Sequence, residues 1–245
     1  MESTMDFRFA QWNAAFRQEA ETLLPGEIDA VYGEDTRAVV PRDQFPYSAI
    51  VLLQVAFGQR LCRATGFLVK QDRVMTAAHA VYDAMTGRFA DSVTIRSYSM
   101  PLRGDQSIGC LGGCCPDAFL QGGRNGDDWA VLRLTAPIPT TPISCADVTG
   151  MPQINQYQAT IAGYPIKVRG SATSDLWSAS GLVQLDPGQK LLRHTISASG
   201  GQSGAPVLLN DNGNWCAVGV HCSDRGRESH ARAFDAELCR KIREY

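Results

Sequence analysis

Short strands separated by turn signals make up most of the chain from about residue 48 onward. Apolar and β-branched runs alternate with turn sequences such as Asn125-Gly126 and Asn212-Gly213-Asn214. Strands of this length at this spacing are typical of β-sandwiches and β-barrels. We therefore expect an all-β fold with strands at residues 48–57, 61–70, 74–77, 92–97, 129–134, 158–163, 177–185, 191–196, 206–209 and 215–220.

The first residues follow a helical period instead. An apolar stripe at steps of three or four residues predicts an amphipathic helix that ends at Pro25-Gly26; the stripe comprises Met5, Phe9, Trp12, Phe16, Ala20 and Leu23. Residues 1–30 are acidic, with six acidic and two basic side chains. We expect this helix to pack on the body of the protein. A removable pro-segment and a docking element for a partner are the alternatives.

Two other stretches complete the outline of the chain. Leu238 and Ile242 lie four residues apart in the charged stretch 235–245, which predicts a closing helix. The stretch 108–125 is rich in Gly and Cys and has little periodicity. We expect it to be a loop that joins the first β half to the strand that begins at Trp129.

Charge and hydropathy exclude several classes of partner. The formal net charge of -2 gives no electrostatic basis for binding nucleic acid or an anionic membrane. No apolar run approaches the roughly 20 residues of a membrane-spanning helix, so membrane insertion is not expected. Independently of charge and hydropathy, we expect a monomer and a protein that needs neither a metal ion nor an organic cofactor.

Cysteine usage points to an oxidising compartment. Eight cysteines suit a mixture of buried thiols and two or three disulfides, with no pairing assigned; they are Cys62, Cys110, Cys114, Cys115, Cys145, Cys216, Cys222 and Cys239. A zinc site at Cys110, Cys114 and Cys115 is disfavoured, because their spacing matches no common zinc motif. The first eight residues lack the basic and apolar regions of a secretory signal, so the chain is made without one or the signal lies upstream.

A histidine and an aspartate stand beside predicted strands. A hydroxyl nucleophile needs a base within hydrogen-bond reach, and a third group must orient that base. His79 follows the hydrophobic strand 74–77 and two alanines, although a buried structural histidine is the alternative. Asp127 and Asp128 both precede the strand 129–134. We choose Asp128 as the orienting group because it directly adjoins the strand, and the alternative for either residue is a simple turn.

The serine-containing sequence Ser199-Gly-Gly-Gln-Ser203-Gly-Ala-Pro206 carries the sharpest signal. Glycines around Ser203 allow a tight turn, and the amides of Gly201 and Ser203 are then placed to stabilise an oxyanion. A phosphate-binding loop is disfavoured because strand-like residues follow it instead of a helix. Together, His79, Asp128 and Ser203 predict an acyl-transfer site.

These blocks resemble the catalytic segments of chymotrypsin-like serine proteases, and the bacterial glutamyl-endopeptidase branch above all. The matching segments are Thr76-Ala-Ala-His79, Asp128-Trp-Ala-Val-Leu-Arg-Leu134, Gly200-Gly-Gln-Ser203-Gly-Ala-Pro206, Ala162-Gly-Tyr-Pro165, Ala217-Val-Gly-Val-His221 and the start 32–50. The resemblance covers residues 31–243. It implies two six-stranded antiparallel β-barrels at 31–135 and 136–233, a C-terminal helix, protein or peptide substrates and a secreted or periplasmic location.

Residue 202 departs from the trypsin pattern. Trypsin-like enzymes place an aspartate immediately before the nucleophile to bind a newly formed amino terminus, and this chain has Gln202. That ion-pair switch cannot operate here, so any activation by removal of residues 1–30 must work differently.

The resemblance also suggests a preference for acidic side chains. The position that selects Lys or Arg in trypsin holds Ser197 here, and His221 stands where glutamate-selective relatives bind the substrate carboxylate. Ala198 replaces a threonine common in relatives, although the hydroxyls of Ser197 and Ser199 are near. We expect cleavage after Glu, with Asp second. A protease-fold binding or regulatory protein without turnover is the competing interpretation, and the intact His79 and Ser203 count against it.

Overall fold

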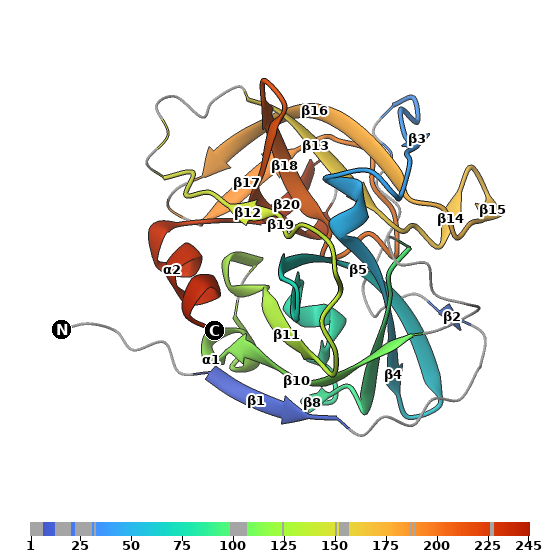
Figure 1. Cartoon of the computed structure of the whole chain (residues 1–245), viewed down its shortest axis with the longest axis vertical. Coiled ribbons are helices and arrows are strands. Elements are labelled where there is room, and N and C mark those ends of the chain that lie inside the picture. Colours follow the sequence, from blue (N-terminus) through green and yellow to red (C-terminus); the bar gives the residue numbers. More distant parts are fainter. Residues whose placement is uncertain are drawn as a thin grey trace.

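Antiparallel strands form two closed barrels in the computed structural model (Figure 1). The structure describes residues 7–12, 21–22, 31, 33–98, 107–123, 125–149, 151, 157–186, 188, 190–225 and 228–245. Each barrel consists of six strands in a ring, and two short strands are added to each ring. The expected all-β, two-barrel fold is confirmed. Within the described residues, no helix is long and apolar enough to cross a membrane.

The first barrel follows the order β10-β11-β6-β5-β4-β9 and closes by the pairing of β9 with β10. Its strands are β4 (Ile50–Phe57), β5 (Arg60–Lys70), β6 (Arg73–Thr76), β9 (Ser92–Arg96), β10 (Ile108–Pro116) and β11 (Ala130–Leu134). Gly66 lies where three strands meet closely, because a Cβ there would stand 2.6 Å from Val74 and 2.8 Å from Leu53. The missing side chain therefore lets three neighbouring strands pack closely.

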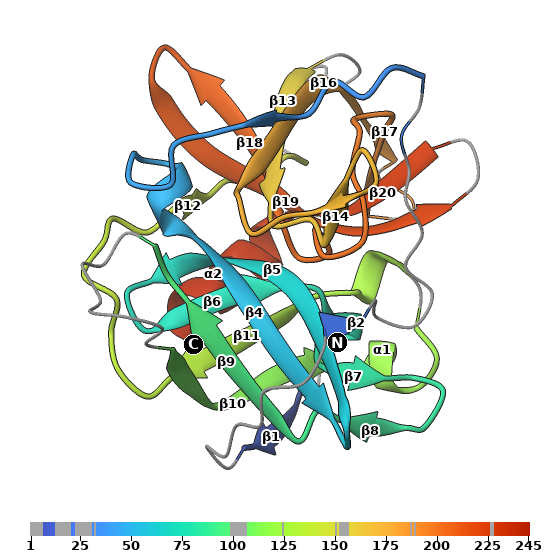
Figure 2. The same cartoon turned by 90° about the vertical axis from the view of Figure 1, so that its right-hand side faces the viewer.

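The second barrel follows the order β19-β18-β13-β16-β17-β20 and closes by the pairing of β19 with β20 (Figure 2). Its strands are β13 (Tyr157–Gly163), β16 (Trp177–Asp186), β17 (Leu191–His194), β18 (Pro206–Asp211), β19 (Asn214–Arg225) and β20 (Glu228–Ala233). Asn212 and Gly213 join β18 to β19 with φ of 51° and 92°. Two successive positive φ angles suit the right-handed twist of a tight hairpin.

Short elements complete the chain. Two of them extend the second barrel, namely β3 (Ala38–Val39), which pairs with β16, and β12 (Ser144–Cys145), which pairs with β19. The remaining short elements are η1 (Tyr47–Ala49), η2 (Ala78–Ala80), β7 (Tyr82–Asp83), β8 (Arg88–Phe89), α1 (Asp117–Leu120), η3 (Asn125–Asp127), β14 (Lys167–Val168) and β15 (Ser171–Ala172).

The expected closing helix is present as α2 (Ala236–Glu244). Asp235 caps its start, since its Oδ1 accepts a hydrogen bond of 2.8 Å from the amide of Leu238. Leu238 and Ile242 are buried in the larger hydrophobic core, as their spacing of four residues predicts. Figure 1 shows the helix lying beside the junction of the two barrels.

The predicted N-terminal helix is wrong for residues 7–11 and 21–22. Phe7–Gln11 forms strand β1, which pairs antiparallel with β10, and Glu21–Thr22 forms β2, which pairs parallel with β5. Phe7 and Phe9 also alternate with polar or small residues, which is the pattern of a strand. The edge of β10 supplies the backbone hydrogen-bond partners that this strand needs. The rest of the predicted helix lies largely outside the described residues.

The expected loop at 108–125 is also wrong, because residues 108–116 form strand β10. A Cβ at Gly113 would lie 2.8 Å from Leu132 and 3.1 Å from the Trp12 ring. Glycine makes room for these two side chains. Because the strand uses glycine at such positions, its sequence lacks the alternation of apolar and polar residues that predicts a strand.

The predicted disulfides are absent, since all eight cysteines are free thiols. Cys114 and Cys115 are successive residues of one strand and so point to opposite faces. Cys145 lies opposite Ala217, whereas Cys216 lies opposite Ser144. The two cysteines are therefore one position out of register and do not face each other. Burial raises the pKa of Cys110 to about 12 and that of Cys114 to about 11, so both thiols stay protonated at neutral pH.

Candidate active site

His79 lies in the short turn η2 directly after strand β6. The small neighbours Ala78 and Ala80 are fully buried and hold the backbone close to the barrel. The His79 side chain keeps 21% of its surface exposed. The imidazole is therefore anchored by its backbone and still accessible from solvent.

Asp128 contacts His79 at two points. Its Oδ2 lies 2.6 Å from the imidazole Nδ1, and its Oδ1 accepts a hydrogen bond of 2.9 Å from the His79 amide. The pairing of β11 with β6, with Ala130 opposite Thr76, places these strand ends side by side. A carboxylate with this geometry fixes both the position of the ring and the tautomer that carries its proton on Nδ1.

The loop that carries Ser203 requires glycine on both sides. Gly201 and Gly204 have φ of 95° and 88°. A Cβ at Gly204 would lie 2.1 Å from the Thr65 carbonyl oxygen and 2.2 Å from the Thr76 hydroxyl. The serine loop of the second barrel therefore packs directly on the end of β6, three residues before His79.

Thr65 of β5 binds the serine loop to the first barrel. Its amide donates to the Ser203 carbonyl at 2.8 Å, and its hydroxyl donates to the Gly201 carbonyl at 2.8 Å. The same hydroxyl accepts a hydrogen bond of 2.9 Å from the Tyr164 amide. The sequence alone predicts no role for Thr65, because a threonine inside strand 60–70 matches no motif.

The backbone of the loop sets the direction of two amides. The Gly200 carbonyl accepts a hydrogen bond of 2.8 Å from Ile166, and the Gln202 carbonyl accepts one of 3.0 Å from Ala205. In a trans peptide the N–H points opposite to the carbonyl. The N–H of Gly201 therefore points away from Ile166, and the N–H of Ser203 points away from Ala205.

The predicted pocket residues are all buried near this loop; they are Ser197, Ala198, Ser199 and His221. His221 adjoins the serine loop, because its amide donates to Ala205 at 2.8 Å and its carbonyl accepts from Gly204 at 2.7 Å. The Ser199 hydroxyl donates to the Lys167 carbonyl at 3.2 Å and accepts from Arg37. The proton of the Ser199 hydroxyl is therefore donated within the protein. The sequence had suggested that this hydroxyl could contact the substrate.

The second barrel carries three histidines on neighbouring strands, His194 on β17, His221 on β19 and His230 on β20. The rings of His194 and His221 lie 5.3 Å apart between centroids. Burial, followed by the charges of His221 and His230, lowers the pKa of His194 well below its ordinary value. His194 is therefore neutral at pH 7. Sequence inspection had selected only His221, because nothing along the chain shows that β17, β19 and β20 are neighbours.

Among the described residues, no three His, Cys, Asp or Glu side chains gather into a metal-binding group.

Comparison with known proteins gives the same architecture. Residues 64–220 match the family of the trypsin-like peptidase domain. A glutamyl endopeptidase of Bacillus licheniformis is 28% identical over an alignment of 215 residues, and the match covers 83% of this chain and 64% of that protein. The chain thus spans slightly less than two thirds of the length of this curated relative.

Solved structures extend the likeness to nearly the whole fold. A Glu endopeptidase in complex with MPD has a TM-score of 0.73 at 23% identity, over 87% of this chain and 98% of its own. The thermostable serine protease AL20 from an extremophilic microorganism has a TM-score of 0.63 at 17% identity, over 80% and 94%. The protease Anisep from Arthrobacter nicotinovorans has a TM-score of 0.65 at 15% identity, over 82% and 95%.

The two glutamyl endopeptidases among these relatives confirm the resemblance seen in the sequence blocks. Because the family match covers well over half of the chain and the fold is shared, the protein belongs to the trypsin-like peptidase domain family.

Proposed function

We propose that this protein is a serine endopeptidase that cleaves peptide bonds through an acyl-enzyme. The observation that carries the proposal is the two-point contact of Asp128 with His79, at 2.6 Å and 2.9 Å, beside the loop of Ser203. An imidazole held in this way is suited to activate a hydroxyl. The names of the relatives, glutamyl endopeptidase and serine protease, support the same reaction.

In the proposed mechanism, the Ser203 Oγ attacks the substrate carbonyl while the His79 Nε2 accepts its proton. Asp128 keeps the Nδ1 proton in place and stabilises the imidazolium. The amides of Gly201 and Ser203 donate hydrogen bonds to the oxyanion. His79 then protonates the leaving amine, and a water molecule activated by the same imidazole hydrolyses the acyl-enzyme.

We further propose that the enzyme prefers Glu, and then Asp, on the amino side of the cleaved bond. A buried carboxylate needs a partner of opposite charge or several hydrogen-bond donors. His221 adjoins the serine loop and supplies such a donor, while Ser197 leaves no charge that would select Lys or Arg. Because His194 is neutral, it places no positive charge beside His221.

Peptides that differ only in the residue before the cleaved bond test this specificity. We expect kcat/KM to be highest for Glu, lower for Asp, and at least about tenfold lower for Gln, because the charge-assisted hydrogen bond is lost. The Ser203→Ala variant is the control for contaminating proteases. Faster turnover after Lys, Phe or Ala would contradict the proposed specificity.

The family resemblance supports three further proposals. We propose that the active form is a monomer, which size-exclusion chromatography with light scattering tests. We propose that residues 31–245 form the catalytic unit, which expression of these residues alone tests, and that the protein is exported, which cell fractionation of the source organism tests.

A further inference from the structure

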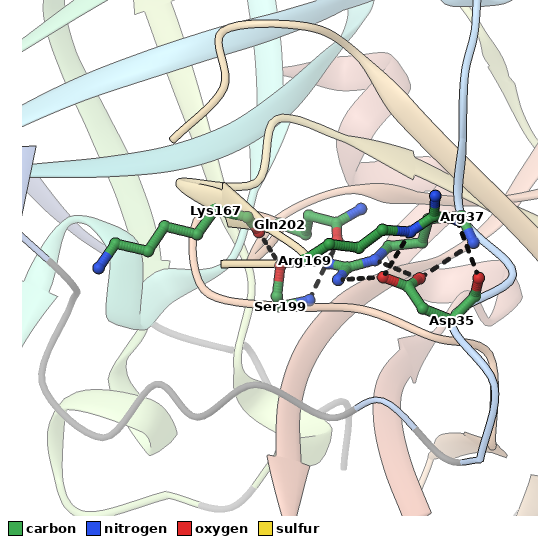
Figure 3. A network of polar contacts seen from close by, with 6 residues as sticks. All are labelled: Asp35, Arg37, Lys167, Arg169, Ser199 and Gln202. Carbon is green, nitrogen blue, oxygen red and sulfur yellow. Dashed lines mark hydrogen bonds and ion pairs between the residues drawn. The ribbon is translucent and has the colours of Figure 1, made fainter. Parts of the chain in front are cut away.

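We propose that Arg37 is a positioning residue that orders the loop before Ser203. The inference rests on the proposed endopeptidase function, and it answers what holds this loop when residue 202 is glutamine. Arg37 lies far from Ser203 in the sequence, yet its guanidinium ends among the side chains of that loop (Figure 3).

The position of Arg37 is set by the segment of residues 33–40, here called the N-terminal strap. Strand β3 within the strap pairs with β16, with Val39 opposite Trp177, and the Val40 amide donates to Leu176 at 3.0 Å. The strap therefore runs along the second barrel before the chain enters the first one. Arg37 immediately precedes β3, so this strand pairing fixes its backbone.

One edge of the guanidinium is neutralised within the strap itself. The Arg37 Nε and Nη2 donate to the two carboxylate oxygens of Asp35 at 2.9 Å and 3.0 Å. Hydrogen bonding by Arg37 lowers the pKa of Asp35, so the carboxylate is ionised at neutral pH. A bidentate pair of this kind compensates a buried positive charge without any acid from the serine loop.

The other edge of the guanidinium faces the loop. Arg37 Nη1 donates to the Ser199 hydroxyl and, at 3.4 Å, to Oε1 of Gln202. That same Oε1 accepts a hydrogen bond of 3.0 Å from the Ser199 amide. Gln202 is fully buried and directly precedes Ser203. The contacts thus enclose residues 199–202, the stretch that includes the Gly201 amide assigned to the oxyanion.

These contacts explain why a neutral glutamine suffices at residue 202. An aspartate at residue 202 would need a positive group as its partner. The nearby positive group is Arg37, and the carboxylate of Asp35 already neutralises one edge of its guanidinium. Gln202 needs only to offer an oxygen acceptor, which it shares between Arg37 and the Ser199 amide. Arg37 therefore orders the loop through hydrogen bonds, and the charge is balanced inside the strap.

The test compares wild type with Arg37→Met, Arg37→Lys and the matched control Arg169→Ala. Arg169 also lies against Asp35, at 4.0 Å, but its side chain is 65% exposed. We measure kcat and KM on the best peptide, the rate of Ser203 labelling by a fluorophosphonate, and the melting temperature. Because a displaced oxyanion donor acts mainly on the transition state, Arg37→Met should lower kcat and labelling roughly 10- to 100-fold, with KM within about threefold.

Arg37→Lys should recover only part of this loss, since an ammonium cannot reproduce the fork between Asp35 and the loop. Arg169→Ala should keep the kcat of wild type. A wild-type kcat in folded Arg37→Met would overturn the inference while leaving the proposed function intact. Wild-type protein without any Ser203-dependent hydrolysis would instead overturn the proposed function, and the inference with it.

Should Arg37→Met fail to fold, Gln202→Met tests the same contact from the loop. It removes the oxygen that accepts from Arg37 and from the Ser199 amide, at nearly unchanged side-chain volume. The inference expects a fall in kcat with little change in KM. A wild-type kcat in this variant would overturn it.

Discussion

Gly204 shows how one missing side chain joins the two halves of the candidate site. Its backbone lies so close to Thr65 and Thr76 that a Cβ would stand 2.1 Å and 2.2 Å from their oxygens, and its φ is 88°. The glycines of the loop were evident in the sequence. Their contacts were not, because Thr65 and Thr76 belong to strands more than a hundred residues earlier in the chain.

Gly204→Ala should destabilise the protein by at least about 2 kcal/mol, since it combines a positive φ with a steric clash. It should also abolish fluorophosphonate labelling of Ser203. Gly213→Ala is the matched control, with φ of 92° but open space around the new Cβ. That variant should lose about 1 kcal/mol and keep normal labelling. Urea unfolding measures both values, and equal losses in the two variants would contradict the packing described here.

His194 carries a pH dependence of stability. Its folded pKa lies well below the ordinary value of 6.5 because it is buried beside two other histidines. Below pH 6.5 the unfolded chain therefore binds a proton that the folded protein excludes. Stability is full above pH 6.5 and falls as the pH drops toward the folded pKa, by up to about 1.4 kcal/mol per pH unit.

Replacement of this histidine by an uncharged residue isolates the effect. His194→Gln should show a shallower decline of unfolding free energy between pH 6.5 and pH 5 than wild type does. Urea titrations at several pH values measure the two slopes. Identical slopes would show that His194 does not remain neutral in the folded protein.

Strands β1, β10 and β20 mark the limit of prediction from sequence at the scale of elements. The apolar strands β4 and β5 were expected almost at their observed bounds. In contrast, β10 contains several glycines and cysteines, and β20 reads Glu-Ser-His-Ala-Arg-Ala. Both are strands because neighbouring strands supply their hydrogen-bond partners, and tertiary pairing of this kind leaves no local signal.

Trp12→Ala tests whether β1 is part of the folded body. The ring is buried and a Cβ at Gly113 would lie 3.1 Å from it, so the substitution should cost about 3 kcal/mol. Activity at low temperature should stay within about twofold of wild type. Met85→Ala is the control, because Met85 is 88% exposed and its loss should leave the unfolding midpoint unchanged. A stable Trp12→Ala variant would show that the N-terminal strand is dispensable.

At the scale of the whole molecule, the candidate site depends on contacts between the two barrels. The order of His79, Asp128 and Ser203 in the sequence was enough to propose a catalytic triad. It did not reveal Thr65, which connects β5 to the serine loop, nor Arg37, which reaches that loop from the N-terminal strap. Thr65 acts from the first barrel and Arg37 from the strap on the second, and neither residue shares a sequence motif with the loop it contacts.

Thr65→Val keeps the shape of the side chain and removes its hydroxyl. The hydrogen bonds of this hydroxyl to the Gly201 carbonyl and from the Tyr164 amide are then lost, which should cost about 1–3 kcal/mol and lower kcat. Thr160→Val is the control, since its hydroxyl lies 2.8 Å from the hydroxyl of the exposed Ser180. Chemical unfolding and peptide turnover measure both effects. Equal results for the two valine variants would contradict the role of Thr65.

Labelling of Ser203 shows whether this serine is a nucleophile activated by His79. The protein is incubated with a fluorophosphonate, digested and analysed by mass spectrometry to locate the adduct. We expect a single adduct on Ser203, absent in Ser203→Ala and slowed at least about a hundredfold in His79→Gln. An unlabelled Ser203, or labelling that is unchanged without His79, would contradict it.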